Sequence, residues 1–376
     1  MKVPSTIAAL VVAAGHVLGS HIEVRPYGFI KADFYLATDG VVSWGTPALT
    51  SVSGASGLDS TAIGFTAQHS RFGLDLRAKV GGIPVGGVAE IDFWVIASNF
   101  NAMPRMRQAY LRIRPIDRLS VDIGQRWDIF SPLNPVTNNT NANLWMNGNY
   151  GFRRPQVAIR YVLDRGELVP VFELSVGEAG KEDQTRLVVD EPPRINTDRF
   201  LGRDNLSMVP LFEGRVGLLF FEDFTAGLGA LTTAYGNEQD FFTWGLGLDA
   251  QLPFHRLASL MGEFVIGTNL DNADLFTIGG NGSADNDVRT YGFWLNLISR
   301  PFEHFHGVLG LARERVYSGA IPGRPETNTT FYTTILFPLG DHVTFAAEYQ
   351  FFSTDLEGRE ANHTAGLFDV AGKLVF

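Results

Sequence analysis

The strongest constraint on the fold is a strict alternation of apolar and polar residues in segments about ten residues long. In residues 70–80, five apolar side chains alternate with a polar face that carries Arg71, Asp75, Arg77 and Lys79. The same pattern recurs in residues 89–95, 108–114, 156–163, 244–249, 343–351 and 368–376. A period of two places successive side chains on opposite faces of a strand. The sequence therefore predicts an all-β fold whose strands each have one apolar face.

The connections between these segments alternate in length. Short turns are expected at residues 81–84, 114–117, 163–166, 221–223, 252–255, 300–302 and 338–341. Longer polar segments are expected at residues 37–60, 98–104, 128–153, 178–210, 235–240, 267–287, 318–328 and 353–362. These fifteen connections imply sixteen strands. Short turns at one rim and long loops at the other are typical of outer-membrane barrels, and only a closed barrel satisfies all strand backbone groups in lipid.

We therefore expect a 16-stranded antiparallel transmembrane β-barrel over residues 21–376. A large soluble β-sandwich or a propeller is the alternative, but the sequence shows no repeat of blade length. Residues 1–20 contain one lysine, an apolar run and then Gly19-Ser20, which is the layout of a secretory signal peptide. That run is too short for a membrane anchor, and no later apolar stretch is long enough for a spanning helix.

Composition excludes several classes of site. The chain has no cysteine, which excludes a disulfide framework, thiol catalysis and cysteine-ligated metal sites. Its net charge of −10 argues against general nucleic-acid binding. We expect no metal and no cofactor.

The polar strand faces indicate a water-filled interior. They carry charged residues, glycine and threonine, and an unpaired charge is very costly in a packed core. A barrel of about 16 strands leaves an aqueous channel. The segment 128–153 follows the fifth expected strand and is rich in asparagine, with apolar anchors at Phe130, Leu144 and Trp145. This layout resembles that of sixteen-stranded porins, whose third long loop folds into the lumen. An ordinary surface loop is the alternative.

Charge is divided unevenly along the chain. Residues 1–165 hold 16 Lys+Arg against 11 Asp+Glu, whereas residues 166–376 hold 14 against 29. We place much of the acidic excess in loops such as 178–204 and 267–287. The expected pore-lining and constriction residues are Arg71, Arg77, Lys79, Arg112, Arg114, Arg126, Asp128 and Arg160.

Basic groups clustered on a pore wall select anions. The alternatives are that these arginines only brace the wall, or that the pore prefers cations. Bracing would pair them with Asp33, Asp75, Glu90, Asp92, Asp122 and Asp128.

Four short stretches carry a resemblance to a known family: Tyr27–Asp33, Ser70–Gly73, Gly124–Phe130 and Arg153–Val157. They resemble the DcaP-like trimeric outer-membrane porins, clearly over residues 25–165 and only in architecture beyond. The resemblance implies a homotrimer and the uptake of small, often negatively charged solutes such as dicarboxylates. Members often carry an N-terminal coiled coil, which we do not expect here because the first expected strand follows the signal peptide closely.

We therefore expect a porin of the bacterial outer membrane, surrounded by its lipids, that prefers small anionic solutes. A non-conducting adhesin or a structural barrel is the alternative. We do not expect an enzyme. Of the eight histidines only His69 adjoins a serine, Ser70, and neighbouring strand residues point to opposite faces.

Overall fold

A computed structural model describes residues 22–38, 41, 50, 61–94, 104–139, 144–163, 166–179, 209–220, 224–236, 240–273, 275–279, 287–302, 304–358 and 363–376. The signal peptide predicted over residues 1–20 lies outside these residues. Most residues of the long connections predicted at 37–60, 98–104 and 178–210 also lie outside the described residues.

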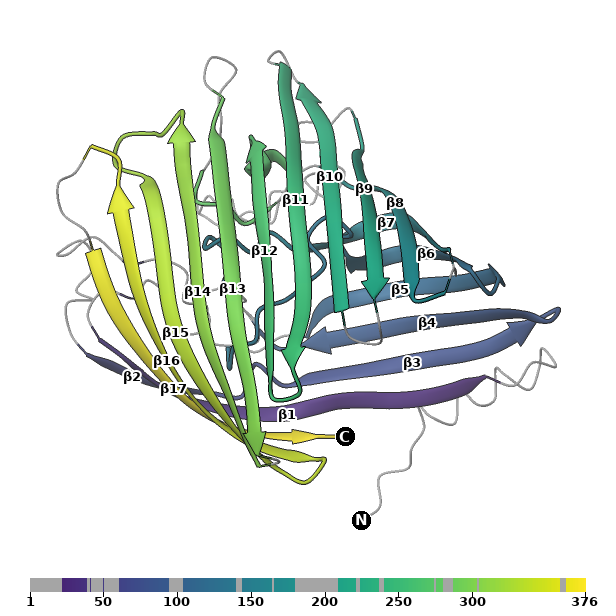
Figure 1. The fold of residues 1–376 in the computed structure, drawn as a ribbon, viewed down its shortest axis with the longest axis horizontal. Helices are drawn as coiled ribbons and strands as arrows, with labels where there is room; N and C mark the ends of the chain where they lie inside the picture. The colour runs from purple at the N-terminus through teal and green to yellow at the C-terminus, as the bar shows by residue number, and fades with distance from the viewer. Residues whose placement is uncertain are drawn as a thin grey trace, which may run out of the picture.

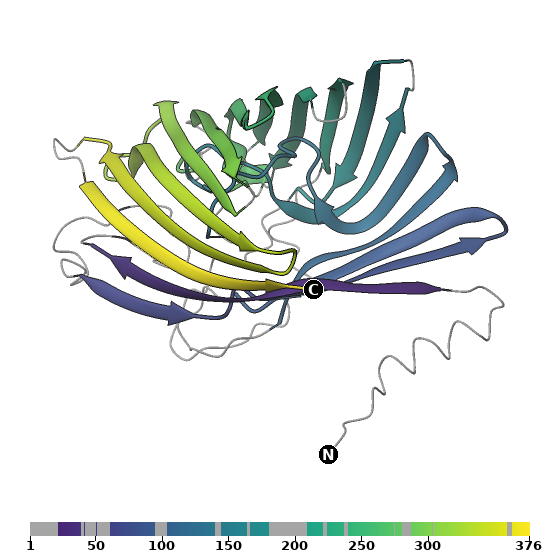
Figure 2. The ribbon, with the colours of Figure 1, turned by 60° about the horizontal axis from the view of Figure 1, so that its bottom comes forward.

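The strands form one antiparallel sheet that closes on itself (Figures 1 and 2). In chain order they are β1 (Glu23–Ala37), β2 (Ala62–Thr66), β3 (Arg71–Val80), β4 (Ile83–Asp92), β5 (Arg105–Ile116), β6 (Leu119–Trp127), β7 (Arg153–Val162), β8 (Leu168–Gly177), β9 (Leu211–Phe220), β10 (Phe224–Gly236), β11 (Asp240–His255), β12 (Ala258–Thr268), β13 (Arg289–Phe302), β14 (Phe305–Ser318), β15 (Pro325–Leu339), β16 (Val343–Leu356) and β17 (His363–Val375). The last strand pairs with the first from Phe29↔Val375 to Ala37↔Leu367.

The second strand of the barrel is interrupted. β2 pairs with residues 33–37 of β1, and β3 pairs with residues 23–29 of the same strand. β2 and β3 therefore share one strand position next to β1, so the seventeen strand segments fill sixteen positions around the barrel. The prediction of a sixteen-stranded antiparallel barrel is confirmed, and the break at residues 67–70 was not predicted.

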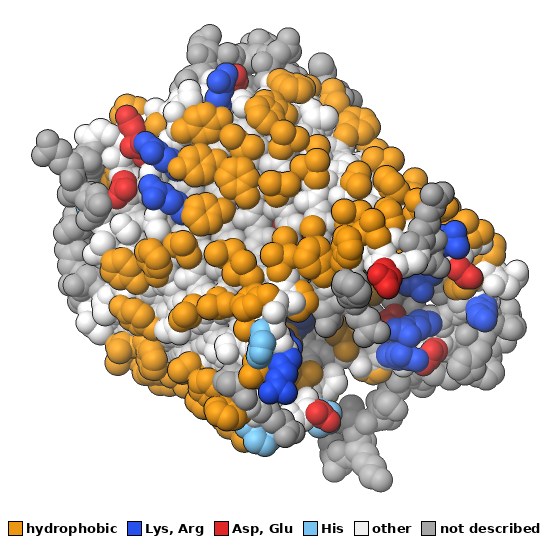
Figure 3. Space-filling model, in the orientation of Figure 1, with side chains coloured by type: hydrophobic (Ala, Val, Ile, Leu, Met, Phe, Trp, Pro, Cys, Tyr) orange, Lys and Arg blue, Asp and Glu red, His pale blue; other side chains and the backbone are white. Residues whose placement is uncertain are grey.

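The outer surface of the barrel is apolar. Side chains such as Phe65 at 75% exposure, Leu174 at 64% and Leu228 at 55% face outward without cover. Figure 3 shows such side chains spread over the face formed by the later strands. In a closed barrel every strand has two neighbours, so the backbone N–H and C=O groups are hydrogen-bonded within the sheet. An apolar outer surface without free backbone groups suits lipid.

The interior is filled in part by the segment that connects β6 to β7. Figure 2 shows this blue-teal segment inside the ring of strands. The buried apolar residues gather where it meets the wall, in clusters that include Phe130 and Leu270, and Leu144 and Trp294. The only helix in the described ranges is a single 3₁₀ turn, Leu270–Ala273. None of the described helical segments has the length and apolar character needed to span a membrane.

Candidate pore constriction

The segment 128–152, here called the constriction loop, begins with a fixed base at the wall. The Asp128 backbone N–H donates to the Phe152 carbonyl at 2.8 Å, which closes the base of the loop. The guanidinium of Arg154 grips the Asp128 carboxylate through two hydrogen bonds of 2.7 and 2.8 Å. Both side chains are buried. A bidentate pair of this kind fixes direction as well as position, so the loop leaves the wall in a defined orientation.

Carboxylates on distant strands hold the loop backbone. Glu213 on β9 accepts from the Ile129 N–H at 3.1 Å, and Glu263 on β12 accepts from the Leu133 N–H at 2.8 Å. Glu348 on β16 accepts from the Asn138 N–H at 2.6 Å. A buried backbone N–H left without a partner is costly, so each of these acceptors holds its part of the loop in place. The loop is therefore attached at intervals along the wall from β9 to β16.

The loop reaches β1 and β17 at Asn138. The Asn138 amide donates to Asp369 on β17 at 2.6 Å, and the Asn138 carbonyl accepts from Lys31 on β1 at 2.8 Å. Beyond it, Asn147 accepts from Thr330 on β15 at 2.9 Å. The expectation that the loop folds inward is confirmed, and two of its asparagines are hydrogen-bonded to the wall.

Apolar contacts seat the loop between these polar anchors. Phe130 is 2% exposed and lies over the glycines of β10 and β11. Trp145 stacks on Phe276 with ring centroids 4.5 Å apart. Gly148 lies so close to β13 that an added Cβ would stand 2.4 Å from the Phe293 nitrogen. The three predicted anchors, Phe130, Leu144 and Trp145, are all buried.

Tyr150 closes the returning arm of the loop. It is buried beside Gly292 of β13. Burial, and then the negative charge of Glu314, raise the pKa of Tyr150 well above its ordinary value. The phenol therefore stays protonated and neutral over the physiological pH range.

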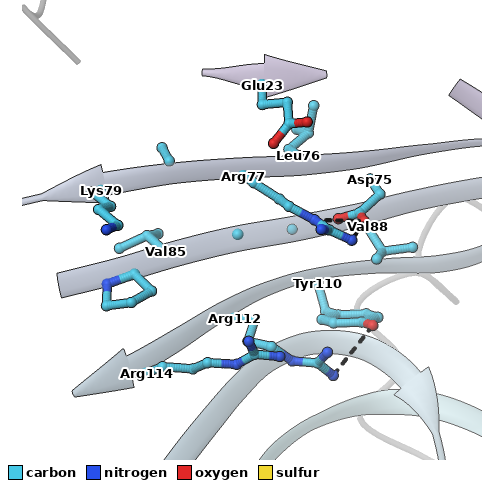
Figure 4. Close-up of a pocket in the computed structure, with 14 residues that line it drawn as sticks. Glu23, Asp75, Leu76, Arg77, Lys79, Val85, Val88, Tyr110, Arg112 and Arg114 are labelled. Carbon is cyan, nitrogen blue, oxygen red and sulfur yellow. Dashed lines mark hydrogen bonds and ion pairs between the residues drawn. The ribbon is translucent and has the colours of Figure 1, made fainter. Parts of the chain in front are cut away.

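The predicted basic residues fall into four groups rather than one continuous cluster. Arg77, Lys79, Arg112 and Arg114 surround one cavity of about 710 Å³ at the short-turn end of β3, β4 and β5. Figure 4 shows their side chains around this space, together with Glu23, Asp75 and Tyr110. Lys79 and Arg114 are exposed and form no ion pair with any described residue. The cavity therefore contains cationic groups that are open to solvent.

Two further groups are tied to carboxylates. Arg112 donates twice to Asp122 at 2.7 Å, and Arg126 donates to the same carboxylate at 2.6 Å. Arg160 lies 3.5 Å from Glu173 on β8, with its side chain 41% exposed. One acid thus serves two bases at Asp122, which leaves an excess of positive charge there.

The fourth group centres on Arg71. Its guanidinium lies 3.7 Å from Glu90, which also accepts from Arg107 at 2.7 Å. Asp92 accepts from both Arg105 and Arg107 at 2.7 to 2.9 Å. Asp128 is not in any of these groups, because it is buried beneath Arg154 at the base of the loop.

All six acids named in the bracing alternative are paired, but only Asp75, Glu90 and Asp122 pair with predicted arginines. The other three pair with basic residues outside the predicted set. Positive charge nevertheless remains on this wall. Strands β3 to β6 hold eight basic and four acidic residues. The wall that anchors the loop carries inward carboxylates, here called the anchor carboxylates: Glu213, Asp249, Glu263, Glu314, Glu348 and Asp369. The lumen therefore lies between a basic wall and a wall rich in carboxylates.

Sequence reasoning missed several basic residues of the interior, among them Lys31, Arg105, Arg107, Arg153, Arg154 and Arg215. A bulge explains two of them. β5 carries one extra residue opposite the Glu90–Ile91 step, so the alternation counted back from Arg112 changes phase before Arg107. The placement of much of the acidic excess in loops also missed the anchor carboxylates, which lie on strands. Each anchor carboxylate lies on a different strand, so no short sequence motif marks them as a group.

Within the described part of the chain, no cluster of histidine, aspartate and glutamate has an arrangement that would hold a metal ion.

Comparison with known proteins yields structural relatives only. No model of a known protein family and no curated protein sequence matches the chain. The outer membrane channel DcaP of Acinetobacter baumannii superposes with a TM-score of 0.75 at 17% identity, covering 94% of this chain and 97% of that one.

Two other barrels are less similar. An anion-selective porin from Comamonas acidovorans superposes with a TM-score of 0.61 at 14% identity, covering 95% of this chain and 100% of that one. The trimer form of OmpT, an outer membrane protein of Vibrio cholerae, gives 0.55 at 12% identity, over 94% and 99% of the two chains. The resemblance to DcaP-like barrels inferred from short motifs is confirmed for the fold.

Proposed function

We propose that the protein is a porin of the bacterial outer membrane, exported by its N-terminal signal peptide, that lets small hydrophilic solutes diffuse through its lumen. The apolar outer surface matches lipid, and the inner surface is charged. The constriction loop is attached to the wall from β9 through β17 to β1, so it narrows the lumen without belonging to the wall. Of the structural relatives described above, two are named as outer-membrane proteins and the third as an anion-selective porin.

The single observation that carries the proposal is the division of charge across the lumen. Eight basic residues on β3 to β6 face four acids, and Lys79 and Arg114 remain exposed. The anchor carboxylates opposite are occupied by the loop backbone and by neighbouring side chains. Mobile anions are therefore attracted to the basic wall, whereas the carboxyl groups opposite are buried and hydrogen-bonded.

The substrate class follows from the same wall. A single arginine guanidinium can bind a carboxylate through two parallel hydrogen bonds. Small anions such as dicarboxylates are therefore the solutes we propose. The role of the eight predicted residues as pore lining belongs to this proposal, except for Asp128, which we assign to the base of the loop.

We also propose a homotrimer. The face around β1, β2 and β17 exposes large apolar side chains, with Phe65 at 75% and Ile63 at 64%. Phe34 packs on Phe65 there, with ring centroids 4.8 Å apart. Phe65→Ser should lower the mass of the particle in detergent from three copies to one, whereas Leu228→Ser on the far strand β10 should not.

Planar-bilayer recording tests the channel itself. The purified, folded barrel should insert in discrete steps of ohmic current. Insertion without current would contradict the porin proposal and favour an adhesin or a structural barrel.

A further inference from the structure

A basic patch faces outward near the long-loop rim of the barrel. Arg289, Arg313 and Arg315 alternate on β13 and β14 with buried residues that face the interior. Register places Arg315 beside Tyr291, and Arg313 beside Phe293. Figure 3 shows basic side chains above and within the apolar surface of this face. Charged side chains on the lipid face are destabilising except near the interfaces.

These arginines are only partly neutralised. Arg315 lies 3.3 Å from Glu326, and Asp355 stands in the same row two strands away. Arg313 and Arg289 form no ion pair with any described residue. The Arg313 Nε is buried and has no hydrogen-bond partner in the described part of the chain. The patch therefore has donors to offer to an anion.

An apolar groove of about 560 Å³ adjoins the patch on β10 to β13. Its floor is a row of small residues, because Ala226 pairs with Ala250 and Ala250 pairs with Gly262. The row above it, toward the long loops, runs from Leu248 to Phe264 and Phe293. That row continues directly to Arg313.

Aromatic side chains mark the level of the membrane interface. The Tyr291 ring stacks against the Phe264 ring with centroids 6.4 Å apart, and its centroid lies 6.2 Å from that of the Tyr317 ring. Tyrosines of this kind concentrate at headgroup level. The arginines thus lie where lipid phosphates lie, and the groove lies where acyl chains lie.

We propose that this face binds a phosphorylated, acylated glycolipid of the outer leaflet, of the lipid A type. Its phosphate would accept from Arg313 and Arg315, with Arg289 adding charge, and one acyl chain would occupy the groove. The inference rests on the proposed function only in placing the barrel in an outer membrane. The site lies on β10 to β14, away from the proposed trimer face at β1, β2 and β17.

Native mass spectrometry of the folded barrel in detergent tests this site. The probes are bisphosphorylated lipid A, its dephosphorylated form and inorganic phosphate at equal concentrations. Wild type should retain bisphosphorylated lipid A at least tenfold more than the dephosphorylated form. R313Q/R315Q should reduce that retention at least tenfold, and Ala250→Trp, which fills the groove, should reduce it with all charges present.

Arg256→Gln removes an exposed arginine at the opposite rim and should retain lipid A as wild type does. Equal retention by wild type and R313Q/R315Q would overturn the proposal. Displacement of lipid A by inorganic phosphate at the same concentration would overturn the acyl part. Conductance separates the two proposals. A barrel that conducts current but does not retain lipid A refutes this site alone. A barrel that retains lipid A but conducts no current refutes the channel alone.

Discussion

Removing the exposed charges of the cavity should weaken anion preference by a calculable amount. Lys79→Gln and Arg114→Gln each delete one unpaired cation, and neither side chain holds a described ion pair that would be broken. Arg313→Gln is the matched control, because it removes the same charge from the outer face of the barrel.

The magnitude follows from the size of the cavity, about 710 Å³. A sphere of this volume has a radius of about 5.5 Å, so an ion at its centre interacts with a lining charge by roughly 0.75 kcal/mol in water. A Debye length of about 10 Å in 0.1 M salt reduces this to roughly 0.4 kcal/mol. Deletion disfavours an anion and favours a cation equally, so the permeability ratio changes by about fourfold for each substitution.

Zero-current potentials in a KCl gradient at about 0.1 M measure this ratio. Each single variant should lower the anion-to-cation permeability ratio by about fourfold, and the double variant by roughly the product of the two. Raising the salt should reduce the effect. An unchanged ratio in both lumen variants, or an equal change in Arg313→Gln, would refute the reasoning.

Three further changes test how the constriction loop is held. Gly148→Ala places a Cβ against the Phe293 backbone at a φ of +93°, which should displace the loop from the wall and raise single-channel conductance. Gly323→Ala is the control, because its φ is +77° but its surroundings are open, and it should leave conductance unchanged. Phe130→Ala should cost about 3–5 kcal/mol of stability, measured as a lower melting temperature, and an unchanged melting temperature would contradict its seating role. Asn138→Asp sets a third carboxylate beside Asp369 and Glu348, which should release the loop and increase current noise, whereas a quiet channel would show that this anchor is dispensable.

The strand pattern could be predicted because it depends on local periodicity. Outward side chains are largely apolar and inward ones are largely polar, so the alternation is visible in most strands, and it changes phase only at irregularities such as the bulge in β5. The interruption between β2 and β3 could not be predicted. It depends on where β1 changes partner, and His69 at that junction is buried by contacts with Asp33 on β1 and with Trp94, which follows β4.

The candidate site was predictable in composition but not in pairing. The basic excess of the first half is visible in the sequence, and so is the asparagine-rich loop. Which arginine meets which carboxylate depends on register between neighbouring strands, as for Arg112 and Asp122. The anchor carboxylates were missed for a related reason. Each lies on a different strand, and its partner, either the loop or Arg215 for Asp249, is distant in sequence.

The zero-current potential of the wild-type channel under a tenfold KCl gradient tests the central claim most directly. A basic wall opposite covered carboxylates predicts that chloride crosses faster than potassium, so the dilute compartment becomes negative relative to the concentrated one. A positive dilute compartment would mean that potassium is preferred, and it would contradict the assignment of β3 to β6 as the wall that selects the solute.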